Sequence, residues 1–561
     1  MTQELSLPQQ KRLIFTAFKK RGLSLAPPAL TALINILKHQ PNDSTSISSI
    51  LTNILDEIKE RLMEQDIPSL VVSSELLQKV VVDMTRDERD VMDEAMQLLD
   101  LKSGMPKLVY EPMKKRFTLD KNNGGRYFGD VDDKVDMLLQ RYVLIHQRLM
   151  RNEAFKPRLT NASSSTEEAV KITPIEGLLG TSGTKILLGM IVQVEEGRYY
   201  LEDPSAQVLM DLSEAEVSSE GFITENSICL VEGEMLEGVL KVQTIGQPIY
   251  ESRTEAIDAI GLQNSDIFGA IPTLSELAKL NEQEIKHGPE GDFIILSDVH
   301  LDDIRVLENL TKLLEGFQDY DPLPVFVLMG DFASKYPSAH LPNANSIITG
   351  FFDDLASIIC KFPKIAKEGR FILVPSQNDP GLGSILPRPP IPNFFTSGLR
   401  SKVKHVHLAS NPCRLRYFSK ELVIGRVNVL SQLRRNCILP LLTMDSDQDD
   451  SPKKDKNDAT NPLVNHAIKT MLDQGHLCPV PLSSLPIYWQ NDHIMRLYPP
   501  PDAIILGDKS SERYYETYKS DCDVMNPGSF CADGGFLVFR PIDFEYKGAP
   551  MKSEVEFSQI E

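Results

Sequence analysis

Four apolar runs in the second half of the chain each end in a cluster of polar residues. The runs are Phe293 to Leu296, Val325 to Met329, Phe371 to Val374 and Ala503 to Leu506. Their length and composition predict buried β-strands, and the apolar stretch from Ile347 to Ile359 predicts a helix between two of them. Strands that alternate with helices indicate an α/β sheet, which usually carries its functional side chains just beyond the carboxyl ends of its strands.

Residues 171 to 250 carry a different pattern, in which short β-type runs alternate with turns. The runs are Ile186 to Val194, Arg198 to Leu201, Val208 to Leu212, Ile228 to Glu232 and Val239 to Thr244. Five short strands in a segment of this length predict a small barrel, and an OB-fold is the natural candidate. We therefore expect an OB-fold domain over residues 166–260.

Residues 1–100 have apolar positions at helical spacing, as in the stretch from Ile47 to Ile58. We interpret them as a helical bundle that buries these faces in its own core, although a compact helical module is also a common docking unit. Residues 101–165 are expected to form a helical linker region, with a helix from Asp133 to Arg148. The polar segment from Asn161 to Thr166 would end this region.

Length and composition agree with a chain of several domains. A chain of 561 residues is too long for one core, and its 41% apolar and 25% charged residues are typical of a soluble globular protein. It has no apolar run long enough to span a membrane, and Met1 to Gln10 lack the apolar core of a signal peptide. We expect a protein of the cytosol or nucleus without a membrane partner. The seven cysteines form no CxxC pair, which argues against a zinc ribbon and a disulfide framework.

The formal net charge of −20 argues against broad contact with nucleic acid, because binding to phosphates depends on Lys and Arg. The expected barrel has 13 acidic and 4 basic residues between positions 171 and 250, a net charge of −9. Its one adjacent aromatic pair is Tyr199 and Tyr200, of which one usually faces the core. The pattern favours a structural or protein-docking barrel, and DNA would be contacted at most indirectly or within a complex.

The polar clusters after the apolar runs partly match a metallophosphoesterase. Such enzymes hold two metal ions with carboxylates and imidazoles, and their sequences read D-x-H, then G-D, then G-N-H-D/E, then a later His and a final G-H-x-H. Asp298, His300 and Asp331 match the first two motifs. These three residues would be the vestige of a metal site. A carboxylate at a strand end also holds neighbouring loop N–H groups, so Asp298 and Asp331 have a structural explanation as well.

The remaining motifs have lost their ligands. In the third motif, Gln377 and Asn378 replace the ligand Asn and the catalytic His. In the last motif, Asp508 and Ser510 replace the two imidazoles, and Lys509 would point a cation at the metal position. His476 is a further candidate for a surviving ligand, but a lone His beside a turn is more often structural. The sequence therefore predicts no catalytic residue, no bound cofactor and no functional metal site.

Several longer stretches carry a resemblance to a known family. Together with the expected domains, the chain resembles the B-subunit family of the replicative DNA polymerases, in which an OB domain precedes an inactivated calcineurin-like phosphoesterase domain. Within that family it is most similar to the epsilon branch, to which the amino-terminal helical module also fits. The stretches include RYVLIHQR (Arg141 to Arg148), YYLEDP (Tyr199 to Pro204), NDPGLGSILPRPP (Asn378 to Pro390), QGHLCPVPL (Gln474 to Leu482) and NPGSF (Asn526 to Phe530).

The resemblance implies a multidomain α+β fold: an N-terminal helical bundle, an OB-fold β-barrel and an α/β metallophosphoesterase-like sandwich over residues 285–545, with a disordered insertion at 444–460. It implies a nuclear, non-catalytic scaffold subunit of the polymerase complex in chromosomal DNA replication. The subunit would bind the C-terminal domain of the polymerase catalytic subunit, and its N-terminal domain would contact the replicative helicase (GINS). The alternative is a metal-dependent phosphoesterase or nuclease with a partial metal site.

Overall fold

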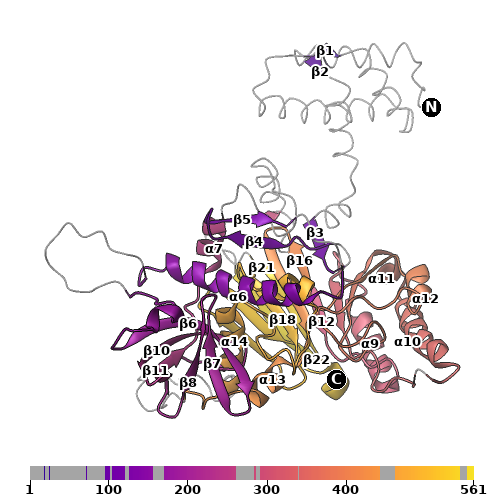
Figure 1. Cartoon of the computed structure of the whole chain (residues 1–561). Coiled ribbons are helices and arrows are strands. Elements are labelled where there is room, and N and C mark those ends of the chain that lie inside the picture. Colours follow the sequence, from indigo (N-terminus) through magenta and orange to yellow (C-terminus); the bar gives the residue numbers. More distant parts are fainter. Residues whose placement is uncertain are drawn as a thin grey trace, which may run out of the picture. The chain divides into compact units, whose positions relative to one another are not determined.

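The computed structural model describes the chain in several segments and divides it into two units, Met1–Ala95 and Met96–Glu561. The described residues are 95–101, 104–120, 126–155, 170–260, 284–285, 291–338, 340–442, 461–543 and 552–560, with Phe18, Ser24–Leu25 and Val71–Val72. Most of the predicted N-terminal helical bundle lies outside the described residues. The predicted insertion at 444–460 lies outside them as well. The barrel and both large sheets belong to the second unit (Figure 1).

The expected small barrel is present, and its strands closely follow the predicted runs. Strands β10, β6, β7, β8 and β11 pair in this order, and β10 also pairs with β11, which closes the barrel. Alternate residues of these strands, such as Leu187 and Ile191, fill its core. The bounds are β6 Lys185–Glu195, β7 Arg198–Glu202, β8 Gln207–Asp211, β9 Glu216–Val217, β10 Ile228–Leu236 and β11 Val239–Gly246.

A first six-stranded sheet contains three of the four strands predicted from apolar runs, which are β12, β13 and β14. Its order is β15-β14-β13-β12-β21-β22, and β12 to β15 are parallel. The bounds of its strands are β12 Phe293–Leu296, β13 Val325–Met329, β14 Arg370–Val374, β15 His405–Leu408, β21 Gly535–Asp543 and β22 Lys552–Gln559. The helices that accompany it are α9 Ile304–Phe317, α10 Ala344–Ile359, α11 Pro363–Glu368, α12 Ser397–Lys402 and α15 Phe530–Asp533.

A second six-stranded sheet has the order β19-β20-β18-β17-β16-β3 and contains the fourth predicted strand, β18. Its bounds are β3 Met96–Leu99, β16 Cys413–Tyr417, β17 Lys420–Arg426, β18 Ala503–Gly507, β19 Tyr514–Tyr518 and β20 Cys522–Asn526. Helices α13 (Val429–Arg435) and α14 (Pro462–Gln474) pack on it. Strand β3 lies inside the segment that the sequence predicted as a helical bundle. The prediction was wrong at these residues, because Met96–Leu99 pairs with β16 at the edge of this sheet.

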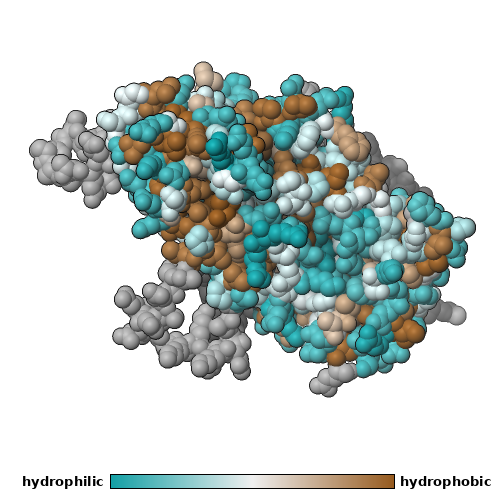
Figure 2. Space-filling view, turned by 60° about the horizontal axis from the view of Figure 1, so that its bottom comes forward, coloured by the Kyte–Doolittle hydropathy of each residue, from teal (hydrophilic) through white to brown (hydrophobic). Residues whose placement is uncertain are grey.

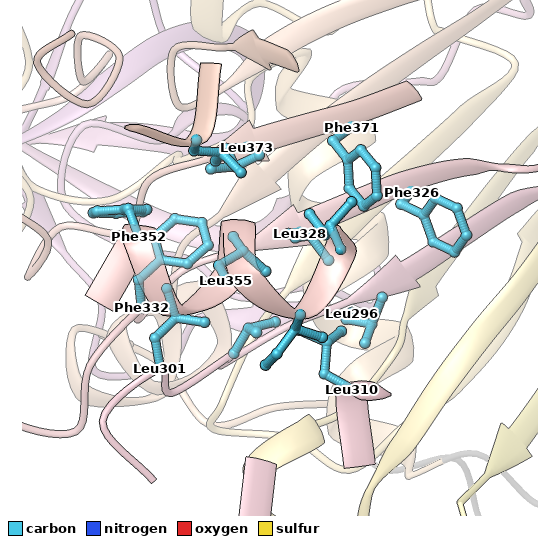
Figure 3. Close-up of a cluster of buried hydrophobic side chains, with 14 of the residues drawn as sticks. Leu296, Leu301, Leu310, Phe326, Leu328, Phe332, Phe352, Leu355, Phe371 and Leu373 are labelled. Atoms are coloured by element: carbon cyan, nitrogen blue, oxygen red, sulfur yellow. The ribbon is translucent and has the colours of Figure 1, made fainter. Parts of the chain in front are cut away.

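The alternation of side chains along the strands explains how the layers meet. One face of the first sheet packs with Leu310 of α9 and with Phe352 and Leu355 of α10 in a large apolar core (Figure 3). The opposite face meets the second sheet, where the rings of Phe293 and Tyr417 pack edge-to-face with their centroids 5.3 Å apart. Helices and strands therefore stack in layers around two cores. The strand residues in the first core are Ile294, Leu296, Phe326, Leu328, Phe371 and Leu373.

Helix α6 (Val131–Arg151) confirms the helix predicted from Asp133 to Arg148. It begins with a capping box between Asp130 and Asp133, and its inner face packs against barrel strands β6 and β10. The short helix η3 (Trp489–Met495) lies against it, and Arg141 of α6 forms an ion pair with Asp492 of η3 at 2.5 Å. Both side chains are buried. Helix α6 therefore fastens the barrel to η3, which lies in the segment that precedes β18 of the second sheet.

The expected linker region is only partly helical. A hairpin of β4 (Leu108–Glu111) and β5 (Arg116–Leu119) precedes α6, and the sequence did not predict it. After the barrel, α7 (Arg253–Ile260) follows. Among the described helices, none combines the length and the apolar character needed to cross a bilayer.

The Arg141–Asp492 pair gives a stability prediction. We expect Asp492→Asn to lower the free energy of unfolding by about 3–5 kcal/mol, because it leaves the Arg141 guanidinium buried without its full counter-charge. Urea denaturation of the full chain measures this. The control is Arg198→Ala, which removes an ion pair whose side chains are 60% and 58% exposed and should change stability little. Equal stability of the two variants would contradict the view that the buried Arg141–Asp492 pair stabilises the fold.

Candidate functional site

The three predicted vestigial ligands lie together at the carboxyl ends of neighbouring strands. Asp298 and His300 follow β12, and Asp331 follows β13. All three are buried, and one ligand atom of each lies within 4.8 Å of the others. The sequence pattern thus located these residues correctly in space, since parallel strands bring their carboxyl ends to one edge of a sheet.

A positive charge from the protein itself lies at this site. Arg426 is the last residue of β17, and its Nη2 donates a hydrogen bond to Asp298 Oδ1 at 2.5 Å and lies 3.7 Å from Asp331 Oδ2. Its Nε donates to the carbonyl of Gly330 at 2.6 Å, and its Nη1 to that of Gly507 at 3.0 Å. The guanidinium therefore supplies one positive charge beside the two carboxylates and ties together the ends of β12, β13, β17 and β18.

Two glycines make room for this arrangement. A Cβ atom on Gly507 would lie 2.8 Å from Cδ of Arg426 and 2.7 Å from Oγ of Ser297. A Cβ atom on Gly330 would lie 2.7 Å from the backbone nitrogen of Ser376. Because real side-chain carbons do not approach backbone or packed atoms so closely, both positions require glycine.

The two carboxylates are also satisfied by neutral donors. Asp298 has a φ of 58°, in the left-handed region, and its Oδ2 accepts a hydrogen bond from Ser529 Oγ at 2.8 Å. Asp331 Oδ1 accepts hydrogen bonds from Ser376 Oγ and, at 3.1 Å, from Asn378 Nδ2. Three of the four carboxylate oxygens of Asp298 and Asp331 therefore accept hydrogen bonds from protein donors.

His300 is paired with a residue that the sequence did not identify. A hydrogen bond with the Cys531 thiol raises the pKa of His300, and the same hydrogen bond lowers the pKa of Cys531. Ser529 and Cys531 follow β20 at the same edge of the sheets. Ser529 lies within the NPGSF stretch, and Cys531 comes just after it. That stretch was the available signal, but a serine and a cysteine after a turn do not by themselves indicate a metal site.

The positions predicted to have lost ligands have other partners. Gln377 donates from Nε2 to the carbonyl of Ser384 at 3.0 Å, and Asn378 donates to Asp331. Asp508 accepts from the backbone nitrogen of Leu430 at 2.9 Å and thereby caps α13. Ser510 donates to Asp508 and accepts from the backbone nitrogen of Ser431 at 3.1 Å. These side chains stabilise loops and a helix start.

A second cation lies beside the one that the sequence suggested for this site. Lys509 is exposed and its charge acts on His300, but the cation bonded to the carboxylates is that of Arg426, which the sequence did not identify. Lys509 uses its backbone nitrogen to donate to Asn428 Oδ1 at 3.0 Å. The long flexible lysine side chain is stabilised by water, whereas the forked guanidinium can satisfy several buried acceptors at once.

His476 belongs to a different cluster. It is buried, its Nε2 lies 3.1 Å from Asp492 Oδ1, and its Nδ1 accepts from the backbone nitrogen of Cys478 at 3.1 Å. Burial lowers the pKa of His476 to about 4. An imidazole with these partners supports the Arg141–Asp492 pair, in agreement with the structural role expected for it.

Asp379, the last residue of the third motif, is a buried loop anchor. Its carboxylate accepts from the backbone nitrogen of Phe332 at 2.8 Å, from that of Ser376 at 2.6 Å and from the hydroxyl of Tyr336 at 2.6 Å. Burial raises the pKa of Asp379. The site as a whole therefore consists of carboxylates that accept hydrogen bonds from protein donors, with the positive charge of Arg426 beside Asp298 and Asp331.

Comparisons with known proteins agree with the resemblance seen in the sequence. A family model that describes the B subunit of DNA polymerases alpha and epsilon matches residues 293–516. A second model, described as DNA polymerase epsilon subunit 2-like, OB-fold domain, matches residues 131–249 and confirms the OB-fold. Among solved structures, a chain of the S. pombe Stn1-ten1 complex covers 15% of this chain and 77% of its own length at 20% identity. Its TM-score of 0.12 is too low to establish a common fold.

Whole-length relatives extend these matches. The B subunit of DNA polymerase epsilon from Arabidopsis thaliana is 32% identical over 96% of this chain and 98% of its own length. DNA polymerase epsilon subunit 2 of Homo sapiens is 32% identical over 94% of this chain and 95% of its own length. The relative from Drosophila melanogaster is 30% identical over 98% of this chain and 99% of its own length. The chain therefore belongs to the B-subunit family of DNA polymerase epsilon, whose members are accessory rather than catalytic subunits.

Proposed function

We propose that this chain is a non-catalytic scaffold in the DNA polymerase epsilon complex and that its phosphoesterase-like site is permanently closed. The observation that carries the proposal is the buried Arg426 guanidinium, bonded to Asp298 at 2.5 Å and lying 3.7 Å from Asp331. Two-metal hydrolysis needs both carboxylates as ligands of metal ions. A resident guanidinium repels such ions and uses the same oxygen atoms.

The proposed domains follow from this role. Residues 1–95 would form the helical docking module, the segment between strand β3 and residue 165 the connecting region, and residues 166–260 the OB-fold domain. Residues 285–545 would form most of an inactivated calcineurin-like phosphoesterase domain, and the two layered six-stranded sheets, to which β3 and β22 add one edge strand each, support this assignment. Its vestigial positions would be Asp298, His300 and Asp331, with the other ligands lost at Gln377, Asn378, Asp508 and Ser510.

The proposed partners are proteins. The barrel and the phosphoesterase-like domain would bind the C-terminal domain of the polymerase catalytic subunit, and the N-terminal module would contact the replicative helicase (GINS) in the nucleus. The negative charge of the chain supports protein partners over direct DNA contact. On the face shown in Figure 2, hydrophobic residues gather in clusters rather than being scattered singly, which is typical of a protein with interaction surfaces.

The alternative is a phosphoesterase or nuclease that uses one ion at Asp298, His300 and Asp331. These residues are close enough to share an ion. However, the ion would have to displace Arg426 from a buried position, and Asn378, which stands at the place of the catalytic imidazole, cannot donate a proton to a leaving group. The alternative therefore has the weaker support.

We expect the purified full chain to show no hydrolysis of DNA ends or of a chromogenic phosphodiester in the presence of MnCl2. The rate should equal that of a variant carrying both Asp298→Ala and Asp331→Ala, because neither carboxylate is free to bind a metal ion. A discontinuous nuclease assay on both proteins is the measurement. Robust hydrolysis that the double substitution abolishes would overturn the scaffold proposal.

Arg426→Ala should lower the free energy of unfolding by about 3–5 kcal/mol, because it leaves two buried carboxylates without a counter-charge. In the variant, Mn²⁺ should raise the melting temperature, since an ion that binds only the folded state stabilises it. The wild-type chain should not respond to Mn²⁺.

Thermal unfolding with and without MnCl2 tests this expectation. Arg305→Ala is the control, because Arg305 is an exposed arginine on α9. If Arg426→Ala does not fold, Arg426→Lys keeps a cation but loses most of the hydrogen bonds, and it should be intermediate in stability. Stabilisation of the wild-type chain by Mn²⁺ would show that the site is open.

The full-length chain should co-purify with the polymerase catalytic subunit, and a chain that lacks residues 1–95 should do so equally well. The reason is that Met96–Glu561 forms a separate compact unit that contains the barrel and both sheets. The same truncation should abolish binding to the helicase component. Loss of the catalytic subunit on truncation would place its binding surface in the N-terminal module instead.

A further inference from the structure

A small internal cavity lies where helix α6 meets the carboxyl end of α14. Its walls come from the second half of α6, from the turn that follows α14 and from the segment that follows η3. The centre of a water-sized particle has about 10 Å³ in which to move, so the cavity takes one water molecule or one monatomic ion. Arg141, Arg148 and Arg496 line it, and all three side chains are buried. We call it the α6–α14 cavity.

Two of these arginines have a buried donor that no described residue satisfies. Arg148 is 4% exposed, its Nη2 donates to the carbonyl of Asp473, and its Nε is buried without an acceptor. Arg496 is 6% exposed, and its Nη1 donates to the carbonyl of Leu108 at 2.9 Å. The Nε of Arg496 lies 3.8 Å from Asp492 Oδ2, which is too far for a hydrogen bond. Buried donors of this kind normally bond an ordered water molecule or an ion.

The charges beside the cavity do not balance. Three carboxylates act on Arg148 and Arg496, but each of them already forms a closer ion pair with a different cation. Two positive charges are therefore left without a carboxylate of their own among the described residues. The carbonyl of Asp473 at the end of α14 offsets only part of one charge, because a helix end carries about half an elementary charge. The three ion pairs are Arg141–Asp492 at 2.5 Å, Lys469–Asp473 at 3.0 Å and Arg151–Glu251 at 2.6 Å.

This excess of charge favours an anion over a water molecule as the occupant. Both could accept hydrogen bonds from the arginines, but only an anion also offsets a buried positive charge, which is costly when it is unpaired. Burial lowers the pKa of Arg148 and of Arg496. A guanidinium nevertheless keeps its proton inside a protein, so the charge has to be met by a counter-ion. The small volume excludes a polyatomic anion such as sulfate.

We propose that the α6–α14 cavity binds one small monovalent anion, such as chloride, between the guanidinium groups of Arg148 and Arg496. Helix α6 packs on the barrel and α14 packs on the second sheet, so the anion stabilises the joint between these two parts. The site shares no residue with the one around Arg426, and the inference therefore does not depend on the proposed scaffold function.

Thermal unfolding of the full chain tests this site, with sodium chloride replacing sodium gluconate at constant ionic strength. The melting temperature should rise by roughly 1–2 °C for each ten-fold increase in chloride above its dissociation constant, because an ion that binds only the folded state stabilises it. Bromide, which is similar in size, should act like chloride. Gluconate is too large for the cavity, so equal melting temperatures in chloride and gluconate would overturn the proposal.

Two arginine variants assign the chloride effect to the cavity. Arg148→Met removes one of the two guanidinium groups and should abolish the response to chloride. Arg253→Met is the matched control, because Arg253 is a partly buried arginine that pairs with Glu421 at 3.1 Å and does not line the cavity. The control should lower the melting temperature but keep the response. A response that survives Arg148→Met, or that is lost equally in the control, would contradict the assignment to this cavity.

A crystal of the wild-type chain soaked in sodium bromide provides a measurement that does not depend on the folding of a variant. Anomalous scattering should locate one bromide ion between Arg148 and Arg496. A water molecule at this position, without anomalous signal, would show that the arginines are hydrated rather than paired with an anion, and the proposal would fail.

Discussion

The guanidinium of Arg426 holds together four strand ends that come from two different sheets. It bonds the carboxylate of Asp298 after β12 and the carbonyls of Gly330 and Gly507 at β13 and β18. In a two-metal enzyme, the two metal ions offset the repulsion between carboxylates that face each other in a buried site. Here a side chain supplies the positive charge, so the chain itself holds the edge of the sheets closed.

A buried charge is costly to remove from water, and it persists only where several acceptors surround it. Arg426 meets this condition because an arginine presents its donors in a flat fork that reaches carboxylates and carbonyls together. The neighbouring glycines are part of the same constraint, since a Cβ at position 507 would collide with the arginine stem. The retained Asp298 and Asp331 then have a physical explanation that does not involve catalysis: they are the counter-charges of Arg426.

The sequence predicted the barrel, the strands β12, β13, β14 and β18, helix α6 and the place where Asp298, His300 and Asp331 meet. These features depend on local apolar periodicity and on polar residues at strand ends, both of which are visible along the chain. Arg426 was missed because its partner Asp298 lies 128 residues away, and an arginine after an apolar run has no distinctive local pattern. The β4–β5 hairpin was missed for a related reason: its strands have four residues each, and its stability depends on contacts with α6 and Tyr498.

Helix α6 joins the barrel to the layered sheets. Its buried face packs on β6 and β10, and its Arg141 forms a buried ion pair with Asp492 of η3. Because one helix makes both contacts, the barrel keeps one orientation toward the sheets. Two buried arginines therefore hold the larger elements together: Arg141 ties the helix under the barrel to η3, and Arg426 ties the ends of β12, β13, β17 and β18. A body held in this way presents its surfaces to a partner without first having to order them.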